Sequence, residues 1–347
     1  MSTQIQFRRD TAANWTSNSP ILAQGEVGLE TDTNSYKIGD GSTTWTALNY
    51  HQLAPEITTL LLDGQSSDPS APAAGELTVY SKAIGGRMML KQIGPSGLAT
   101  SLQPFLGRNK VGYWNPPGNN TTQPGVFGYT ALTTTGSTVT TRSVATVNLF
   151  QQMRRLGFVS AIAASSIATA YVAPLQITIG TGTSGLGGFY KVCRFGCSDA
   201  ATLPGTPRQF VGVSALGAPT NVEPSTLTNT IGVGHGAADT NLKMYCGGSS
   251  AQTPVSLGSN FPINTLSADV YELVLFAPSS DSTHVYWEVT RLNTGNVATG
   301  TFTGTPGTTL PSTTQLLSYQ WAWRTNGSST TAKAGLDIMS DYIETDN

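Results

Sequence analysis

Apolar and polar residues alternate over short stretches in most of the second half of the chain, and glycine, proline, asparagine and serine separate these stretches. A two-residue period places alternate side chains on opposite faces of an extended strand, so each stretch predicts a half-buried strand. Because the turns between them are short, we expect antiparallel pairing and a large β-sandwich over residues 108–347. The clearest stretches are residues 174–179, 189–195, 210–214, 270–276, 285–291 and 336–343.

One stretch follows a different period. Apolar side chains recur there at steps of one, three and four residues, and Gly157 follows as a stop signal. This spacing predicts one short helix near residues 146–156. The expected fold class is therefore all-β, with a sandwich of jelly-roll or lectin-like type and one short helix. The apolar positions are Leu149, Phe150, Met153 and Leu156.

Residues 53–107 predict a linker followed by a β-hairpin neck. The segment 66–75 is rich in serine, proline and alanine, as linkers are. Two extended runs, 76–82 and 87–92, flank Gly85 and Gly86, which can supply the positive φ angles of a tight turn. A sheet this small is marginal by itself. We therefore expect the neck to pair with copies of itself.

Residues 1–52 predict a small amino-terminal β domain. Residues 4–8 alternate as a strand, Asp10 is placed to cap a short helical turn, and Thr33 to Ser35 have turn chemistry. An ordered set of short motifs runs through this part of the chain. The set comprises Ile5-Gln6-Phe7-Arg8-Arg9-Asp10, Asn14-Trp15, Ser19-Pro20-Ile21-Leu22, Gly25-Glu26-Val27-Gly28, Asp32-Thr33-Asn34-Ser35-Tyr36-Lys37-Ile38-Gly39-Asp40-Gly41 and Trp45.

This set resembles the amino-terminal domain of the major tropism determinant family of bacteriophage fibre proteins. Phrases in the larger part resemble a module that recurs in predicted phage tail and head fibre proteins. Those phrases are residues 185–189, 219–224, 232–236 and 337–347.

The resemblance implies a virion protein that is assembled in the host cytoplasm and forms a homotrimer. Its amino-terminal domain would attach to other phage structural proteins. Its distal sandwich would bind the bacterial host surface through a glycan, with a surface polysaccharide or a surface protein as the partner. A capsid head-fibre or decoration protein is an alternative. A polysaccharide depolymerase is an alternative of another class.

Charge and hydropathy narrow the classes of partner. Charged residues make up 11% of the chain and the formal net charge is −2. No basic surface for phosphates is indicated, so no nucleic-acid partner is expected. No run of about 18 apolar residues occurs, so neither a membrane span nor a secretion signal is expected.

No cofactor or metal site is predicted from residue spacing. Asp32, Asn34 and Asp40 lack the spacing of a calcium loop. The glycine-rich residues 180–185 match a dinucleotide-binding pattern, but a strand-like run follows where a helix is required. The cysteines and histidines show no paired spacing, so buried free thiols are expected. They are Cys193, Cys197, Cys246, His51, His235 and His284.

No catalytic constellation stands out, so the chain is not expected to be an enzyme. Glycoside cleavage uses two carboxylates on a groove, and no pair is singled out by spacing. No Gly-x-Ser-x-Gly elbow marks a catalytic serine. The available carboxylates of the large unit are Glu223, Asp239, Asp269, Glu272 and Glu288.

An aromatic stripe is the best candidate for receptor contact. Tyr319, Trp321 and Trp323 alternate, so all three rings are expected on one strand face, with Arg324 and Asn326 beyond them. Rings stack on the apolar face of a sugar, and amide or guanidinium groups bind its hydroxyls. The alternative is that these rings belong to the core or to a subunit interface. Loops 234–241, with His235 and Asp239, and 247–254 are further candidates.

Overall fold

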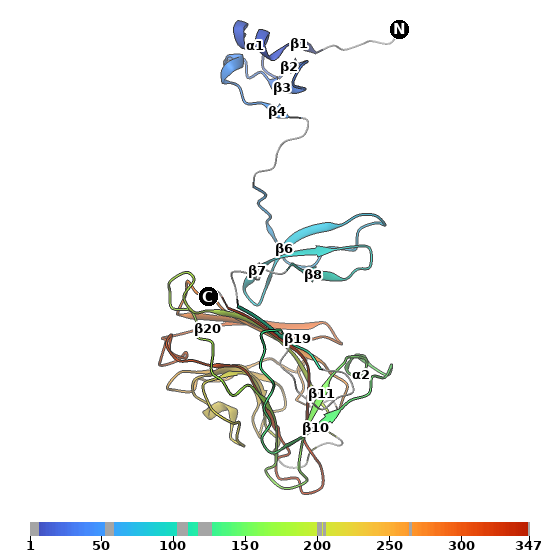
Figure 1. Cartoon of the computed structure of the whole chain (residues 1–347), viewed down its shortest axis with the longest axis vertical. Coiled ribbons are helices and arrows are strands. Elements are labelled where there is room, and N and C mark those ends of the chain that lie inside the picture. The colour runs from blue at the N-terminus through green and yellow to red at the C-terminus, as the bar shows by residue number, and fades with distance from the viewer. Residues whose placement is uncertain are drawn as a thin grey trace. The chain divides into compact units, whose positions relative to one another are not determined.

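The computed structural model describes residues 7–52, 59–102, 110–116, 127–199, 203, 206–263 and 266–345. The chain divides into two compact units, Met1–Leu62 and Asp63–Asn347. Figure 1 shows the strands of both units, which are almost entirely β. This composition confirms the predicted all-β class.

The first unit is a four-stranded sheet with a short helix. The strand order is β1-β2-β3-β4, with β1 parallel to β2 and the other pairs antiparallel. Most of the predicted strand at 4–8 lies outside the described residues. The elements are β1 (Arg8–Asp10), α1 (Ala12–Asn18), β2 (Val27–Glu30), β3 (Ser35–Ile38), the 3₁₀ turn η1 (Trp45–Ala47) and β4 (His51–Gln52).

Two tryptophans form the centre of this unit. The rings of Trp15 and Trp45 stack with centroids 4.2 Å apart and are buried with Leu22. The predicted cap was wrong by one residue, because the side chain of Thr11 accepts the Asn14 amide at the start of α1. Asp10 instead accepts bonds from the Thr11 amide and the Asn14 side chain. A helix with a side-chain cap is therefore present as predicted, but the capping residue is Thr11 and not Asp10.

The second unit begins with a small sheet that contains the predicted hairpin. Gly85 and Gly86 have φ angles of 55° and 81° at the turn, a region that favours glycine. One face of this sheet is covered, because Asp68 accepts bonds from Tyr80 and Lys91. The sheet order is β5 (Gly64–Gln65), β6 (Thr78–Ile84), β7 (Arg87–Ile93) and β8 (Ala99–Ser101).

The tip of this hairpin contacts the sandwich. The Gly85 amide donates to the Glu288 carboxylate at 3.2 Å. Arg87 donates to Glu344 at 2.7 Å, and its guanidinium lies 5.0 Å from the Tyr190 ring centroid. Since the Glu344 side chain is almost fully buried, Arg87 compensates a carboxylate that would otherwise be costly to bury.

The rest of the second unit is a sandwich of two sheets. The first large sheet runs β10-β11-β22-β13-β18-β19-β20, and β9 also pairs with β22. Its strands are β9 (Lys110–Trp114), β10 (Ser137–Thr141), β11 (Leu156–Ser160), β13 (Phe189–Cys197), β18 (Tyr271–Ala277), β19 (His284–Arg291), β20 (Asn296–Thr303) and β22 (Gly335–Thr345).

The second sheet has six strands and includes the aromatic stripe. Its order is β12-β21-β14-β15-β16-β17, with antiparallel pairing throughout. Its strands are β12 (Ile167–Tyr171), β14 (Gln209–Ser214), β15 (Thr230–His235), β16 (Lys243–Gly247), β17 (Val255–Ser256) and β21 (Ser318–Thr325), and the 3₁₀ turn η2 (Pro224–Thr226) lies between β14 and β15.

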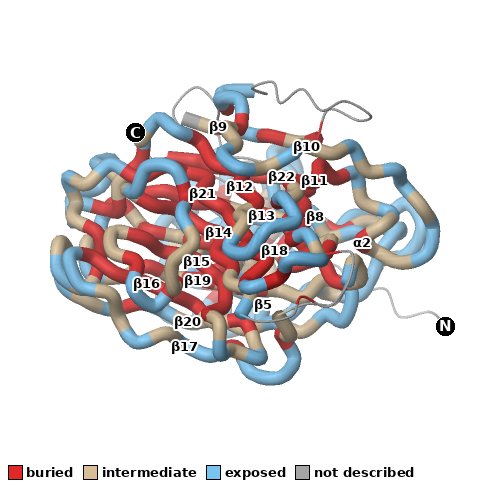
Figure 2. The backbone as a smooth tube through the Cα atoms, turned by 90° about the horizontal axis from the view of Figure 1, so that it is seen from below, coloured by how far each residue is buried: buried red, intermediate tan, exposed pale blue. Residues whose placement is uncertain are grey.

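The main core lies between these two sheets. Phe158, Phe189 and Phe195 from the first sheet belong to one buried cluster with Val211 and Val233 from the second. Figure 2 shows that buried stretches are concentrated in the strands of the two sheets. A second cluster lies on the opposite face of the six-stranded sheet and comprises Tyr171, Phe210, Leu227, Tyr245, Trp321 and Trp323.

Two predicted elements differ from the structure. The helix predicted near residues 146–156 is reduced to the four residues of α2 (Leu149–Gln152). Leu156 instead begins β11, because the pairing of β11 with β10 and β22 overrides the local helical period. Arg155 donates to the carbonyls of Gln151 and Met153 just after the helix. The predicted strand at 174–179 is reduced to a bridge between Ile177 and Leu317.

Candidate functional site

The aromatic stripe is buried. β21 lies between β12 and β14, and all eight of its residues are buried. Its rings therefore do not form an exposed surface for a ligand in this structure, and the arrangement is that of the core alternative. The buried members of the predicted contact set are Tyr319, Trp321, Trp323, Arg324, Asn326 and His235.

The three rings also do not share one face, so that prediction was wrong. Tyr319 belongs to the main core, whereas Trp321 and Trp323 belong to the cluster on the other side of the sheet. The pairing register between β14 and β21 shifts between Gly212 and Ser214, opposite this part of β21. Such an irregularity inserts a residue and changes the face that a side chain takes.

Arg324 and His235 belong to an internal polar network. The Arg324 guanidinium donates to both Asp199 oxygens, to Gln209 at 2.8 Å, and lies 3.0 Å from His235 Nε2. Burial and the neighbouring Arg324 charge lower the pKa of His235 to about 3, so the ring is neutral. Asn326 likewise donates to the Ala163 carbonyl. The polar side chains of Arg324, His235 and Asn326 are therefore bonded to other groups within the protein.

Asp239 is the one member of the predicted set that is partly exposed. Burial alone would raise its pKa, but hydrogen bonds from Lys243, the Gly236 amide and Tyr245 hold it below its usual range. The next amide, that of Ala237, donates to Glu223 at 3.2 Å. Two carboxylates therefore accept hydrogen bonds from consecutive amides of the loop after β15.

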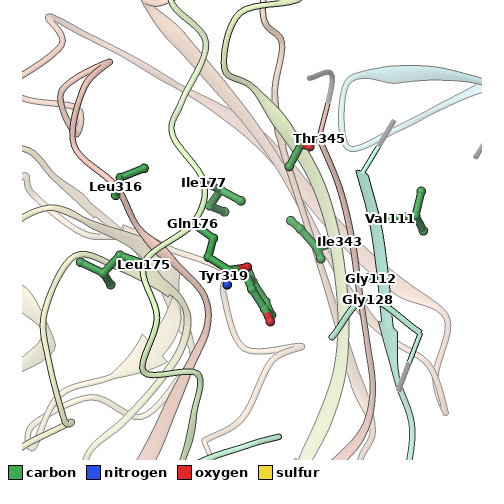
Figure 3. A pocket seen from close by; sticks show the side chains of 10 residues that line it. All are labelled: Val111, Gly112, Gly128, Leu175, Gln176, Ile177, Leu316, Tyr319, Ile343 and Thr345. Atoms are coloured by element: carbon green, nitrogen blue, oxygen red, sulfur yellow. The ribbon is translucent and has the colours of Figure 1, made fainter. Parts of the chain in front are cut away.

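A cleft of about 570 Å³ lies in the second unit, and Tyr319 lines it (Figure 3). The inner side of β9 and the end of β22 form one wall. Segments beside the Ile177–Leu317 bridge contribute to the opposite wall. The lining residues are Val111, Gly112, Gly128, Leu175, Gln176, Ile177, Leu316, Tyr319, Ile343 and Thr345.

The Tyr319 ring is held firmly in this cleft. It packs edge-to-face against Tyr129 with centroids 4.5 Å apart, and its hydroxyl accepts the Thr130 amide at 3.1 Å. Tyr129 in turn donates to Asp341, which is also paired with Lys191. Burial raises the pKa of Asp341 to about 6. A buried polar network thus supports the wall of the cleft.

Gln176 and Leu316 were missed from sequence, although both are exposed at the cleft. They lie in irregular segments far apart in the chain. The bridge between Ile177 and Leu317 brings them together, and the Gln176 backbone amide also donates to the Leu317 carbonyl at 2.8 Å. No local pattern marks such a pair, because it is created by a long-range pairing.

Residues 5–43 match the family model of the major tropism determinant N-terminal domain. This match confirms the resemblance of the first unit. It covers the segment that contains Trp15 and the turn residues 32–41.

Two relatives come from phages of Streptococcus pyogenes, and both are named hyaluronoglucosaminidase. One is 45% identical over 47 residues, which cover 14% of this chain and 13% of the relative. The other is 29% identical over 124 residues, which cover 33% of this chain and 37% of the relative. The chain thus spans much less than half the length of either relative. Together with the family match, they support a phage protein.

These relatives correct one prediction. No catalytic constellation was singled out by residue spacing, and the chain was therefore expected not to be an enzyme. That expectation is contradicted, because both relatives are named as an enzyme.

The sandwich is similar, at low identity, to a solved lectin and to a solved phage module. Peanut lectin with a 9mer peptide is 13% identical, with 68% of this chain and 97% of that chain covered and a TM-score of 0.41. The CBM2 module of the evolved Dit of Lactobacillus casei BL23 phage J-1 is 12% identical, with 68% and 96% covered and a TM-score of 0.35. The assignment of the fold rests on the two sheets themselves.

Three further features of the described residues concern membrane-spanning helices, metal-binding groups and the reactivity of the cysteines. No helix among them is long and apolar enough to cross a membrane. Within the same residues, no group of three or more His, Cys, Asp or Glu side chains is arranged to hold a metal ion. The three cysteines are free and buried, and burial raises the pKa of Cys197 and Cys246 to about 12.

Proposed function

We propose that this chain is a phage virion protein that binds a polysaccharide on the bacterial surface through the cleft around Tyr319. The cleft carries this proposal. Its walls are mostly apolar, Gln176 adds an exposed amide, and the buried Tyr319 ring lies behind them, which is the composition of small-ligand sites. The family match of residues 5–43 supports a role in host recognition.

The chemistry of the lining suits a sugar. Leu175 and Leu316 offer apolar surface for the C–H face of a pyranose ring. The side-chain amide of Gln176 can donate hydrogen bonds to sugar hydroxyls and accept hydrogen bonds from them. Because the buried Tyr319 ring is fixed by Tyr129 and Thr130, the wall of the cleft that it supports loses little freedom on binding.

The test uses the full chain and hyaluronan fragments, the first polysaccharide to examine given the names of the two relatives. We expect the double variant Gln176→Ala, Leu316→Ala to weaken binding about tenfold, equivalent to about 1.4 kcal/mol. The matched control, Gln152→Ala with Leu186→Ala, removes an exposed amide and an exposed leucine outside the cleft. Equal binding by both double variants would contradict the role of the cleft.

We further propose that the protein is a homotrimer joined at the small sheet. Val79, Met88 and Leu90 are exposed on this sheet, whereas Tyr80 and Lys91 point to the face covered by Asp68. An exposed apolar face of this kind is buried by association. Light scattering should give three times the 36.3 kDa chain mass. A stable monomer would contradict this part of the proposal.

Attachment to the particle is assigned to the first unit. The match of residues 5–43 to a phage domain family supports this role. Antibody labelling of virions should place the protein on tail fibres. Labelling confined to the head would instead support a capsid head-fibre or decoration protein.

A second candidate function is cleavage of the bound polysaccharide. It is favoured by the names of the two relatives. Glycosidases use two nearby carboxylates, and Glu223 and Asp239 hold consecutive amides at the surface. Release of reducing ends from hyaluronan should then be lost in Glu223→Gln and Asp239→Asn, while Glu272→Gln retains it. No release by the intact protein would contradict this candidate.

A further inference from the structure

The outer face of the eight-stranded sheet carries a second hollow of about 360 Å³. It is formed by adjacent side chains of three neighbouring strands, β9, β22 and β13. Tyr113 lies directly opposite Tyr342 in the pairing register, and Tyr342 lies opposite Val192. The side chains that line this hollow are Tyr113, Val192, Arg194, Ser340 and Tyr342, and we call them the outer platform.

The outer platform faces away from the core. Lys191 donates to Gln320 of the other sheet and pairs with Asp341, so both Lys191 and Asp341 point inward. Because side chains alternate along a strand, their neighbours Tyr342 and Val192 point outward. Tyr113 is 39% exposed, which is unusual for a ring on a strand of this sheet. The platform is therefore a surface that a ligand can reach.

The polar groups of the platform are fixed in place. Tyr342 donates to Glu344 at 2.9 Å, and Glu344 is also bound by Arg87. Burial, followed by the Glu344 charge, raises the pKa of Tyr342, so its hydroxyl stays protonated. Arg194 is held by Glu272 through Nε at 2.6 Å, and its side chain remains 42% exposed.

We propose that the outer platform is a second sugar-binding subsite. One hexopyranose unit stacks its apolar face on Tyr113, and its hydroxyls bind the Arg194 Nη groups and Ser340. A shallow face with the exposed Tyr113 ring beside the anchored Arg194 guanidinium has the chemistry for this ligand class. The inference rests on the proposed function, since it concerns the same polysaccharide.

The two sites share the strands β9 and β22. Gly112 and Ile343 line the cleft from the inner side, whereas Tyr113 and Tyr342 form the platform on the outer side. Gly112 and Ile343 are themselves paired. In this proposal, a long polysaccharide passes around the edge of the sheet at β9 and contacts both sites. Linked contacts of this kind increase affinity without a stronger individual site.

The experiment compares short and long hyaluronan fragments on the full chain. The wild-type protein should bind fragments of about twenty sugars at least tenfold more tightly than fragments of about four. Tyr113→Ala and Arg194→Gln should lose most of this gain and keep the binding of the short fragment. Val297→Ala is the matched control, because Val297 is exposed on β20 of the same sheet but lies outside the platform.

The outcomes separate this inference from the proposed function. Unchanged binding of the long fragment by both Tyr113→Ala and Arg194→Gln would overturn the platform but leave the cleft in place. No binding of either fragment by the wild-type protein would overturn the proposed hyaluronan function and this inference with it. Equal losses in Tyr113→Ala and Val297→Ala would also overturn the platform, since the effect would then not be local.

Discussion

β21 and β9 both carry aromatic residues on strands of the sandwich but hold them in opposite environments. Trp321 and Trp323 on β21 are buried, and the Trp321 indole donates to the Gly217 carbonyl of a covering loop. Tyr113 on β9 is exposed at a strand that pairs with β22 alone among the described strands. The comparison teaches that alternation predicts a face, whereas sheet order and covering loops decide whether that face meets solvent.

The first prediction tests the buried side of this comparison. Trp323→Ala should lower the free energy of unfolding by about 3–5 kcal/mol, because it opens a cavity among packed rings. Tyr113→Ala, the exposed counterpart, should change it by less than about 0.5 kcal/mol. Denaturant unfolding of both variants measures the difference. Similar losses in the two variants would show that Tyr113 is also a core residue.

The two arginines near these strands allow a similar comparison. Asp199→Ala should cost about 3–5 kcal/mol, because it leaves the Arg324 charge buried without its carboxylate. Glu272→Ala breaks the partly exposed pair with Arg194 and should cost less than about 1 kcal/mol. Thermal unfolding measures both. A small effect of Asp199→Ala would mean that water reaches Arg324.

The buried support of the cleft should give a pH dependence. Asp341 has a pKa of about 6 in the folded protein against 3.8 when unfolded, so the folded state binds more protons between these values. Its contribution is complete below about pH 4 and is lost as pH rises through 6, by up to about 3 kcal/mol. Unfolding measured from pH 4 to 7 should show this loss.

Asp341→Asn is the control for that pH dependence, because an amide cannot titrate. The difference between the two proteins isolates Asp341 from the other carboxylates. An identical pH profile in wild type and variant would show that the pKa of Asp341 is not raised.

The smallest effect concerns the support of the platform. Arg87→Met should cost about 2 kcal/mol, because the nearly buried Glu344 then loses a charged partner. Lys82→Met is a matched control on the same hairpin, since its pair with Asp68 is longer and more exposed. Urea unfolding compares the two variants. Equal costs would contradict a special role for the Arg87–Glu344 pair.

The sequence predicted what short-range patterns determine. Strands at 189–195 and 270–276 were identified because their periods match the pleat, and they pair with each other in β13 and β18. The first unit was recognised from residues 5–43, in agreement with the family model. The burial of Trp323 was not determined, because it depends on which strands flank β21.

Neither the cleft nor the platform could be predicted from the sequence, and the reason is similar for both. The cleft depends on the bridge that brings Gln176 beside Leu316. The platform depends on the register that sets Tyr113 opposite Tyr342. Both are long-range pairings between segments that show no local sign of belonging together.

The hairpin tip has a mechanical consequence. Glu344 accepts a bond from Arg87 of the hairpin and another from Tyr342 of the platform. A pull on the small sheet is therefore transmitted through one carboxylate to Tyr342, which lies opposite the Tyr113 ring of the platform in the pairing register. In the proposed virion protein, tension on the small sheet would load this linkage, so the proposed binding at the platform would be coupled to that tension.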